Sequence, residues 1–222
     1  MKINNRLKTI GDLVEKDSVC LDVGCDHALL DIYLVKQKKN IKAIASDIAD
    51  GPIATAKNNI KREKLEGIIE VRQGDGLSTY TNDINTIIIS GMGGRNMIGI
   101  CKYKKDVLKK VNTFIVSPNN YQEDVKKYLT KNGFYIENEE FVKDKKFIYQ
   151  IIIFKKGKKK YTKKDYFFGP VFLIKKGPLF REYYERELKS REILLALLPK
   201  GYRLKKYQIK QEIKMIKNEI ED

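Results

Sequence analysis

One stretch of the chain decides the fold: Val19-Cys20-Leu21-Asp22-Val23-Gly24-Cys25-Asp26-His27-Ala28. It is a short apolar run that ends in an acid, followed by a glycine and by a helical pattern that starts at Leu29. Such a strand–loop–helix unit is typical of a cofactor site in a doubly wound α/β domain, because glycine lets the backbone approach a ligand at the helix N-terminus. Only one of the usual three glycines is present, so an ordinary strand-to-helix turn would look the same.

The same pattern of strand and helix repeats along the chain. Apolar runs predict strands at 18–23, 41–46, 68–72, 84–89 and 113–116, and two longer strands at 134–141 and 146–154. Helical spacing predicts helices at 7–14, 29–38, 51–65, 95–110 and 121–131. This alternation predicts an α/β fold with a doubly wound, mostly parallel sheet of seven strands, in which the closing hairpin makes the last strand antiparallel.

The basic residues are concentrated in the last third of the chain. The 222 residues carry a formal net charge of +16, and 42% are hydrophobic, enough for one α/β domain and a smaller second part. From Lys155 to Asp222 there are 20 Lys and Arg residues against 9 Asp and Glu residues. A Lys-rich codon bias would spread the charge evenly, whereas this distribution favours a basic surface for a polyanion such as RNA, DNA or anionic lipid.

A change in composition indicates a second domain after residue 156. Lys155-Lys156-Gly157-Lys158-Lys159-Lys160 is a charged break, which a solvated linker would also explain. Apolar residues then recur at helical spacing on both sides of Pro199-Lys200-Gly201. We therefore expect domains at 1–156 and 157–222, the second being a basic, antiparallel, coiled-coil-like helical hairpin.

The three cysteines, Cys20, Cys25 and Cys101, form no C-x-x-C motif. This odd number argues against a disulfide framework and a zinc site, and a reducing cytoplasm is the simplest setting. We therefore expect no metal as partner. No apolar stretch has the length of a signal peptide or a membrane span, so we do not expect a membrane as partner either. No P-loop motif is present, and a monomer is the default expectation.

Acidic residues end three successive predicted strands: Asp22, Asp47 and Asp75. Ligands of such sheets bind at the carboxyl ends of the strands, and an acid at the end of the second strand can accept hydrogen bonds from ribose hydroxyls. A strand end or a turn would explain each acid alone equally well, but together they favour a nucleotide-type cofactor. The only histidine, His27, lies inside the first of these loops, where a packed or capping residue is the alternative.

Several motifs are more specific than the glycine loop. They are Asp22-Val23-Gly24-Cys25-Asp26-His27-Ala28, Gln73-Gly74-Asp75-Gly76-Leu77, Ser90-Gly91-Met92-Gly93-Gly94, Pro118-Asn119-Asn120, Ile148-Tyr149-Gln150-Ile151 and Phe168-Gly169-Pro170. In these motifs the chain resembles the bacterial tRNA (adenine-22-N1)-methyltransferases, class I S-adenosylmethionine-dependent enzymes with a Rossmann-like fold and an antiparallel last strand. The chain departs from the family in having Asp47 where Glu is frequent and Cys25 where Ser is common.

The resemblance implies transfer of the methyl group of S-adenosylmethionine to N1 of adenine-22 in a tRNA. It implies cofactor contacts from Asp22, Gly24, Cys25, Asp26, Asp47, Ile48, Gly74, Asp75, Gly76, Ser90, Gly91 and Met92. Substrate contacts are expected from Gly93, Gly94, Pro118, Asn119 and Asn120 and, in the basic tail, from Arg181, Arg186, Arg191 and Arg203. Asp26 is the first candidate for catalysis, as an acceptor for the adenine amino group, with His27 as a hydrogen-bond partner. A loop-capping or purely cofactor-binding Asp26 is an equal alternative.

Two other functions stay open at this stage. The first is a methyltransferase that acts on another RNA position or on a small molecule. The second is a non-catalytic RNA-binding protein on the same fold. The basic tail argues against a small-molecule substrate, and the acids at three strand ends argue against a degenerate cofactor site.

Overall fold

The structure is a computed structural model that describes residues 3–37 and 41–221. The strands are β1 Val19–Val23, β2 Lys42–Asp47, β3 Ile69–Gln73, β4 Thr86–Ser90, β5 Thr113–Ser117, β6 Phe134–Asp144 and β7 Phe147–Lys156. The helices are α1 Asn5–Leu13, α2 Leu29–Lys36, α3 Asp50–Arg62, α4 Gly94–Tyr103, α5 Lys105–Lys110, α6 Gln122–Lys131, α7 Lys163–Phe168, α8 Pro170–Lys175, α9 Pro178–Leu197 and α10 Arg203–Glu221, with a short 3₁₀ turn, η1, at Gly76–Thr79.

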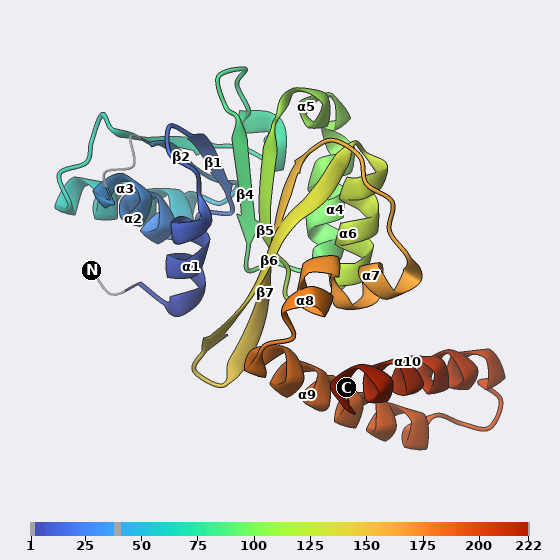
Figure 1. Ribbon diagram of the computed structural model, residues 1–222. Coiled ribbons are helices and arrows are strands. Elements are labelled where there is room, and N and C mark those ends of the chain that lie inside the picture. Colours follow the sequence, from blue (N-terminus) through green and yellow to red (C-terminus); the bar gives the residue numbers. More distant parts are fainter. Residues whose placement is uncertain (1–2, 38–40, 222) are drawn as a thin grey trace. The chain divides into compact units, whose positions relative to one another are not determined.

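The seven strands form one sheet in the order β3-β2-β1-β4-β5-β7-β6 (Figure 1). β1 pairs in parallel with both β2 and β4. β7 pairs antiparallel with β5 and β6. The predicted doubly wound sheet with an antiparallel last strand is therefore confirmed. The strand order reverses between β1 and β4, and ligands of such sheets bind beyond the carboxyl ends of the strands at this point.

Helices cover both faces of the sheet, with α1–α3 on one side and α4–α6 on the other (Figure 1). The side chains of β4 show how the two cores arise. Ile87 and Ile89 pack in one buried cluster with Met97 of α4, while Ile88 packs in a second cluster, with Ile10 of α1. Successive strand residues point to opposite faces, so a strand buried on both faces has a near-continuous apolar run in place of an alternating pattern. This is why the strands are visible in the sequence as continuous apolar runs.

Local structure differs from the prediction in three places. The helix predicted over 95–110 is broken into α4 and α5, because Lys104 has the non-helical angles φ −126° and ψ 59°. Helices α7 and α8 have six residues each, too few for a periodic signal. Thr162 starts α7 with a capping box that Asp165 completes. The end predicted for the second helix, near Lys38, lies outside the described residues.

A buried ion pair holds the start of α8. Lys126 of α6 and Glu139 of β6 are both fully buried, with 3.7 Å between Nζ and Oε1. Oε2 of Glu139 accepts hydrogen bonds from the N–H groups of Val171 at 2.9 Å and Phe172 at 3.4 Å. Burial raises the pKa of Glu139 and lowers the pKa of Lys126, and each charge partly offsets the shift of the other. The first turn of α8 is thus fixed by a side chain distant in sequence.

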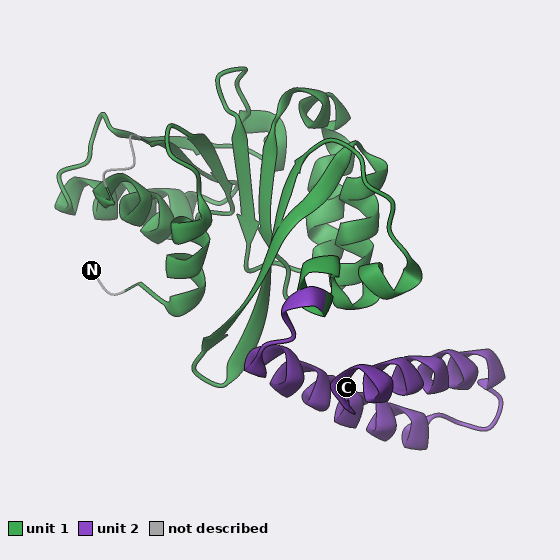
Figure 2. Cartoon of the chain, viewed as in Figure 1, with its two compact units in different colours: residues 1–173 green, residues 174–222 purple. Residues whose placement is uncertain are grey.

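The chain forms two compact units, residues 1–173 and 174–222 (Figure 2). In the second unit α9 and α10 pack against each other as a helical hairpin, with Phe180, Tyr184, Ile209 and Ile216 buried. The predicted boundary after residue 156 precedes α7, which packs on α6 within the first unit. The division into a catalytic and a tRNA-binding domain stays a prediction. None of the described helices is long and apolar enough to span a membrane.

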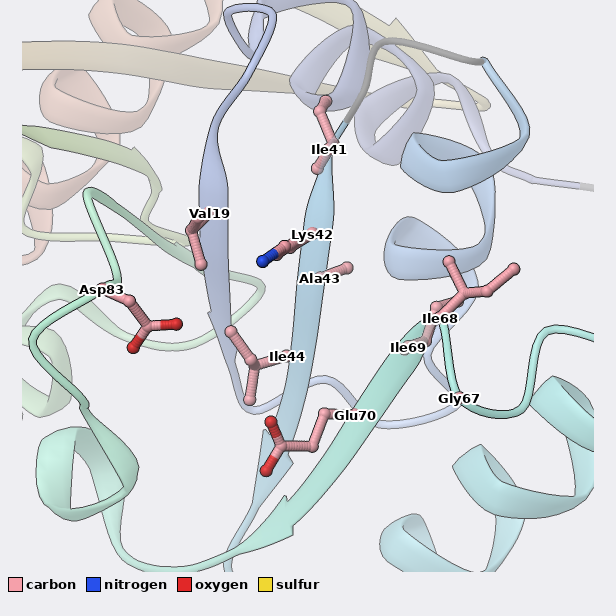
Figure 3. A pocket seen from close by; sticks show the side chains of 10 residues that line it. All are labelled: Val19, Ile41, Lys42, Ala43, Ile44, Gly67, Ile68, Ile69, Glu70 and Asp83. Atoms are coloured by element: carbon pink, nitrogen blue, oxygen red, sulfur yellow. The ribbon is translucent and has the colours of Figure 1, made fainter.

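A hollow of about 720 Å³ lies on the sheet at the opposite end from the predicted site (Figure 3). The crossover from β3 to β4 contains the four-residue turn η1, whereas the other parallel crossovers contain α-helices. Val19, Lys42 and Ile69, the first residues of β1, β2 and β3, line the hollow. It therefore lies at the amino ends of the strands, and the carboxyl ends hold the residues considered next.

Candidate active site

The carboxyl ends of the parallel strands bring most of the predicted residues to one edge of the sheet. Asp47 and Ser90 are the last residues of β2 and β4, and Asp75 follows β3. Asp22, near the end of β1, is buried beneath this edge. Burial raises the pKa of Asp22 well above its ordinary value, and the nearby charge of Asp31 adds to this shift. Asp22 therefore lies under the loop, whereas Asp47 and Asp75 reach its surface.

The loop after β1 is shaped by three residues in the left-handed region. Gly24, Asp26 and Ala28 have φ values of +75°, +52° and +54°. The N–H groups of Gly24 and Cys25 both donate to the carbonyl oxygen of Ser46, at 2.8 and 3.0 Å. These donors tie the loop to β2 and are already used, and the Cys25 side chain is buried. The exposed residues of the loop are Gly24, Asp26 and His27, and of these only Asp26 and His27 carry polar side chains.

Asp26 and His27 lie next to each other at the rim of the site. Nε2 of His27 is 3.3 Å from Oδ2 of Asp26, and the two side chains are 49% and 68% exposed. Asn59 of α3 holds the loop by donating to the His27 carbonyl at 2.9 Å. Among the described residues, no backbone N–H donates to the Asp26 carboxylate, which argues against the loop-capping alternative. This carboxylate is available to accept a hydrogen bond from a bound base.

Asp47 and Ile48 fit the adenosine part of a nucleotide-type cofactor. The Asp47 carboxylate accepts hydrogen bonds from the N–H groups of Asp26 at 3.4 Å and Ala49 at 3.1 Å. Each carboxylate oxygen has two lone pairs, so acceptor capacity is left for a ribose diol. Ile48 is 63% exposed, an apolar surface on which an adenine ring can pack. The acceptor carboxylate of Asp47 and the apolar surface of Ile48 therefore suit S-adenosylmethionine. The described residues contain no group of His, Cys, Asp and Glu side chains suited to a metal ion.

Arg72 holds the loop at 74–76 in place. Its Nε and Nη2 donate to the two carboxylate oxygens of Glu70 at 2.7 and 2.8 Å. Its Nη1 donates to the carbonyl of Thr79 at 2.7 Å, at the end of η1. The segment that carries Asp75 leaves β3 at Gln73, and Arg72 ties its far end at Thr79 back to β3. The bond from Arg72 to Thr79 thus holds the backbone around Asp75 and does not involve the Asp75 side chain.

The loops after β4 and β5, residues 90–94 and 118–120, are locked to each other. Nδ2 of Asn119 donates to the carbonyl of Gly91 at 2.7 Å, and the N–H of Gly94 donates to the carbonyl of Asn120 at 3.2 Å. A Cβ on Gly94 would lie 2.6 Å from that carbonyl oxygen, so only glycine fits. Met92 extends toward the first loop, its Cε 3.0 Å from where a Cβ of Gly24 would be. The predicted cofactor and substrate loops are therefore contiguous.

The second unit holds the four predicted arginines, and three of them have partners within the hairpin. Arg181 donates from Nε to the carbonyl of Ile220 at 3.2 Å. Arg186 pairs with Glu182, and Arg191 pairs with Glu187 and Glu212. Arg203 is exposed and belongs to no ion pair of the described chain. A role of these arginines in tRNA binding stays a prediction. Of the four, Arg203 is the one whose guanidinium is available to bind a phosphate.

Arg6 of α1 is a residue at this edge that sequence analysis does not identify. Its Nη1 lies 3.4 Å from Oδ1 of Asn119, and its guanidinium lies over the ring of Tyr149 at 4.5 Å from the centroid. Both partners are more than a hundred residues away in the sequence, and Arg6 belongs to none of the motifs. Only the folded chain reveals the contact.

Asp31 of α2 carries a buried carboxyl group close to Asp22. Both of its carboxyl oxygens are buried, and neither accepts a hydrogen bond from another residue of the described chain. Burial raises the pKa of Asp31 to about 7, from an ordinary value of 3.8. The folded state therefore retains a proton that the unfolded chain loses near pH 4, and stability falls as the pH rises from about 4 through 7.

We expect Asp31→Asn to remove this part of the pH dependence. A three-unit pKa shift corresponds to about 4 kcal/mol as an upper limit. We expect the free energy of unfolding of the variant to exceed that of wild type by about 2 kcal/mol, half of this limit, at pH 8, and to equal it at pH 4. Urea denaturation at pH 4, 6 and 8 measures the difference. Asp50→Asn, on the exposed start of α3, is the control. A constant difference between Asp31→Asn and wild type across this range would show that Asp31 is ionised in the folded state.

The sheet order, the acids at the strand ends and the glycine loop define a class I S-adenosylmethionine-dependent methyltransferase. The sequence model of the TrmK family, described as tRNA (adenine(22)-N(1))-methyltransferase, matches residues 20–221. The chain belongs to this family. The tRNA (adenine(22)-N(1))-methyltransferase of Bacillus subtilis is 27% identical, over all of this chain and 95% of that protein.

Solved structures of related proteins agree with this assignment. A putative tRNA (m1A22) methyltransferase of Streptococcus pneumoniae is 30% identical, with a TM-score of 0.92 over 99% of this chain and all of that one. The same S. pneumoniae protein in complex with S-adenosyl-L-methionine gives 29% identity and a TM-score of 0.89, over 97% of this chain and 98% of that one. The similarity therefore extends over both units of the chain.

Proposed function

We propose that the chain transfers the methyl group of S-adenosylmethionine to N1 of adenine-22 in a tRNA. The observation that carries the proposal is the loop 24–28, which presents an uncapped Asp26 carboxylate beside the cofactor edge in a chain matched by the family over residues 20–221. The complex of the S. pneumoniae relative with S-adenosyl-L-methionine supports the choice of cofactor.

The reaction needs alignment more than it needs a strong base. Neutral adenine carries a lone pair on N1, so no proton has to be removed before attack. S-adenosylmethionine supplies an electrophilic methyl group on a sulfonium. The N1–CH₃ bond forms as the S–CH₃ bond breaks, the electron pair stays on sulfur, and the methylated base becomes a cation that loses a proton from its amino group. The protein contributes by positioning N1 in line with the methyl group and by stabilising the developing positive charge.

We assign the charge-stabilising role to Asp26. Its carboxylate can accept a hydrogen bond from the adenine amino group, and that bond strengthens as the base becomes cationic. His27, 3.3 Å from this carboxylate, orients it. Asp47 and Ile48 hold the ribose and adenine of the cofactor, and Asp75 accepts from its adenine amino group. The glycines at 91, 93 and 94 allow the target base to approach the loop backbone closely.

We assign tRNA binding to the second unit and to the basic segment at 155–160. An adenine in a folded tRNA must leave its stack to reach the methyl group, at a cost of a few kcal/mol. Phosphate contacts from basic side chains such as Arg203 can offset this cost, and binding should then weaken steeply as salt rises. A helical hairpin of coiled-coil type places such side chains along an extended surface. The proposal therefore includes an enzyme that binds RNA, acts in the cytoplasm and works as a monomer.

The runner-up is a methyltransferase of the same fold that acts on another RNA position. A non-catalytic RNA-binding protein is less favoured, because Asp47 and Asp75 at the strand ends and the exposed Ile48 support a cofactor site. The position of the methylated nucleotide distinguishes the first alternative from the proposed function, and binding of S-adenosylmethionine distinguishes the second.

Labelled S-adenosylmethionine and unmodified tRNA test the proposal. We expect label in a tRNA with adenine at position 22 and none in the same tRNA with guanine there. Equal labelling of the two tRNAs would refute the choice of nucleotide. Failure to bind S-adenosylmethionine in calorimetry would refute the enzymatic function as a whole.

A further inference from the structure

The guanidinium of Arg6 lies against the loops that form the candidate methyl-transfer site. A Cβ on Gly91 would lie 3.0 Å from its Nη2, so the charge lies directly beside the backbone of the loop after β4. Nη1 is 3.4 Å from Oδ1 of Asn119 in the loop after β5. The ring of Tyr149, 4.5 Å from Cζ, supports one face of the group. Arg6 is thus held in position by three separate segments.

This guanidinium is incompletely satisfied. Among the residues that the structure describes, no carboxylate forms an ion pair with Arg6, and the long bond to Asn119 is the only hydrogen bond that its side chain makes. Its Nε is buried and has no acceptor in the described chain. Buried donors without partners are rare in proteins, and an arginine presents its donors as a fork that matches the oxygens of phosphate or carboxylate.

We infer that Arg6 is an oxyanion-binding residue of the active site. The inference rests on the proposed function, because two anions come to this edge of the sheet in that reaction: the phosphates beside the target adenosine and the carboxylate of the cofactor's amino-acid part. Stacking on Tyr149 fixes the plane of the guanidinium before the anion arrives, which lowers the entropy lost on binding. The anion would then position the reacting group against the loops at 90–94 and 118–120.

The test uses Arg6→Gln and Arg6→Lys in the full chain, with Lys8→Gln as control. Lys8 is on the same helix and pairs with Asp12, away from these loops. Calorimetry gives the Kd of S-adenosylmethionine and of methylthioadenosine, which lacks the carboxylate. Kinetics give kcat/KM for tRNA at several salt concentrations. Lys8→Gln should leave all of these quantities unchanged.

Each source of the anion has its own signature. If Arg6 binds a tRNA phosphate, Arg6→Gln should lower kcat/KM for tRNA by about 10–100-fold and reduce the salt slope by about one unit, with the Kd of S-adenosylmethionine kept. If it binds the cofactor carboxylate, the Kd of S-adenosylmethionine should rise by about tenfold and that of methylthioadenosine should not. Arg6→Lys should recover part of either loss, because it keeps the charge and loses the fork.

Two results would overturn the inference while leaving the proposed function intact. One is wild-type kcat/KM and Kd values in Arg6→Gln. The other is an equal fall in melting temperature and in both affinities in Arg6→Gln and Arg6→Lys, which would mean that Arg6 only holds the loops together. Absence of methylation by the wild-type chain would instead refute the proposed function, and the comparison of the two cofactor ligands would still test Arg6.

Discussion

Asp26→Asn should lower kcat by about 100-fold or more while the Kd of S-adenosylmethionine changes by less than about threefold. Loss of a charged group that acts on developing charge typically costs this much. Asn is the appropriate substitute because residue 26 has φ +52°, a conformation that Asn tolerates and most other residues do not. Single-turnover kinetics at saturating cofactor, together with calorimetry, measure the two quantities separately.

Asp47→Asn is the matched control for Asp26→Asn. It removes the same charge from the end of β2, where we propose that the carboxylate binds the cofactor ribose. We expect its Kd for S-adenosylmethionine to rise by about tenfold with kcat at saturation largely kept. If Asp26→Asn behaves in this way instead, Asp26 is a cofactor-binding residue, and its catalytic assignment fails.

Lys126→Met should destabilise the first unit by about 3 kcal/mol in urea denaturation. The substitution leaves the carboxylate of Glu139 fully buried without its counter-charge, and uncompensated buried charges are costly. Because Glu139 also accepts the first N–H groups of α8, part of this loss should come from a weakened start of that helix. Lys127→Met is the control, since its exposed pair with Glu123 should contribute less than about 1 kcal/mol.

The double variant Lys126→Met/Glu139→Gln should be more stable than Lys126→Met alone. Replacement of a buried ion pair as a whole is frequently close to neutral, because the desolvation cost of both charges disappears together. A Gln at position 139 retains an oxygen acceptor for the N–H of Val171. Equal losses in Lys126→Met and Lys127→Met would show that the buried pair contributes no more than a surface pair.

Much of the fold is predictable from the sequence because its cues are local. The centre of β4, Ile87 to Ile89, is a continuous apolar run, because both faces of the sheet are covered there. Pro199 and Gly201 mark the break between α9 and α10. Helix α8 is the opposite case. It has six residues, and its first N–H groups are satisfied by Glu139, which lies 32 residues before Val171 in the chain. No window of sequence contains both halves of that interaction.

The candidate site shows the same division. Asp22, Asp47 and Asp75 could be predicted to share one edge, because the carboxyl ends of parallel strands do so in every sheet of this type. Their environments could not be predicted: Asp22 is buried with a raised pKa, whereas Asp47 binds loop N–H groups at the surface. Arg6 could not be predicted, because only the packing of α1 against the sheet brings it to Asn119 and Tyr149.

The most direct test of the proposed function is to identify the methylated nucleoside and its position. The tRNA, after reaction with the wild-type enzyme, is cut into defined fragments, and their nucleosides are separated and weighed by mass spectrometry. We expect 1-methyladenosine, confined to the fragment with nucleotide 22. N6-methyladenosine, or 1-methyladenosine at another position, would contradict the alignment of adenine-22 N1 with the methyl group.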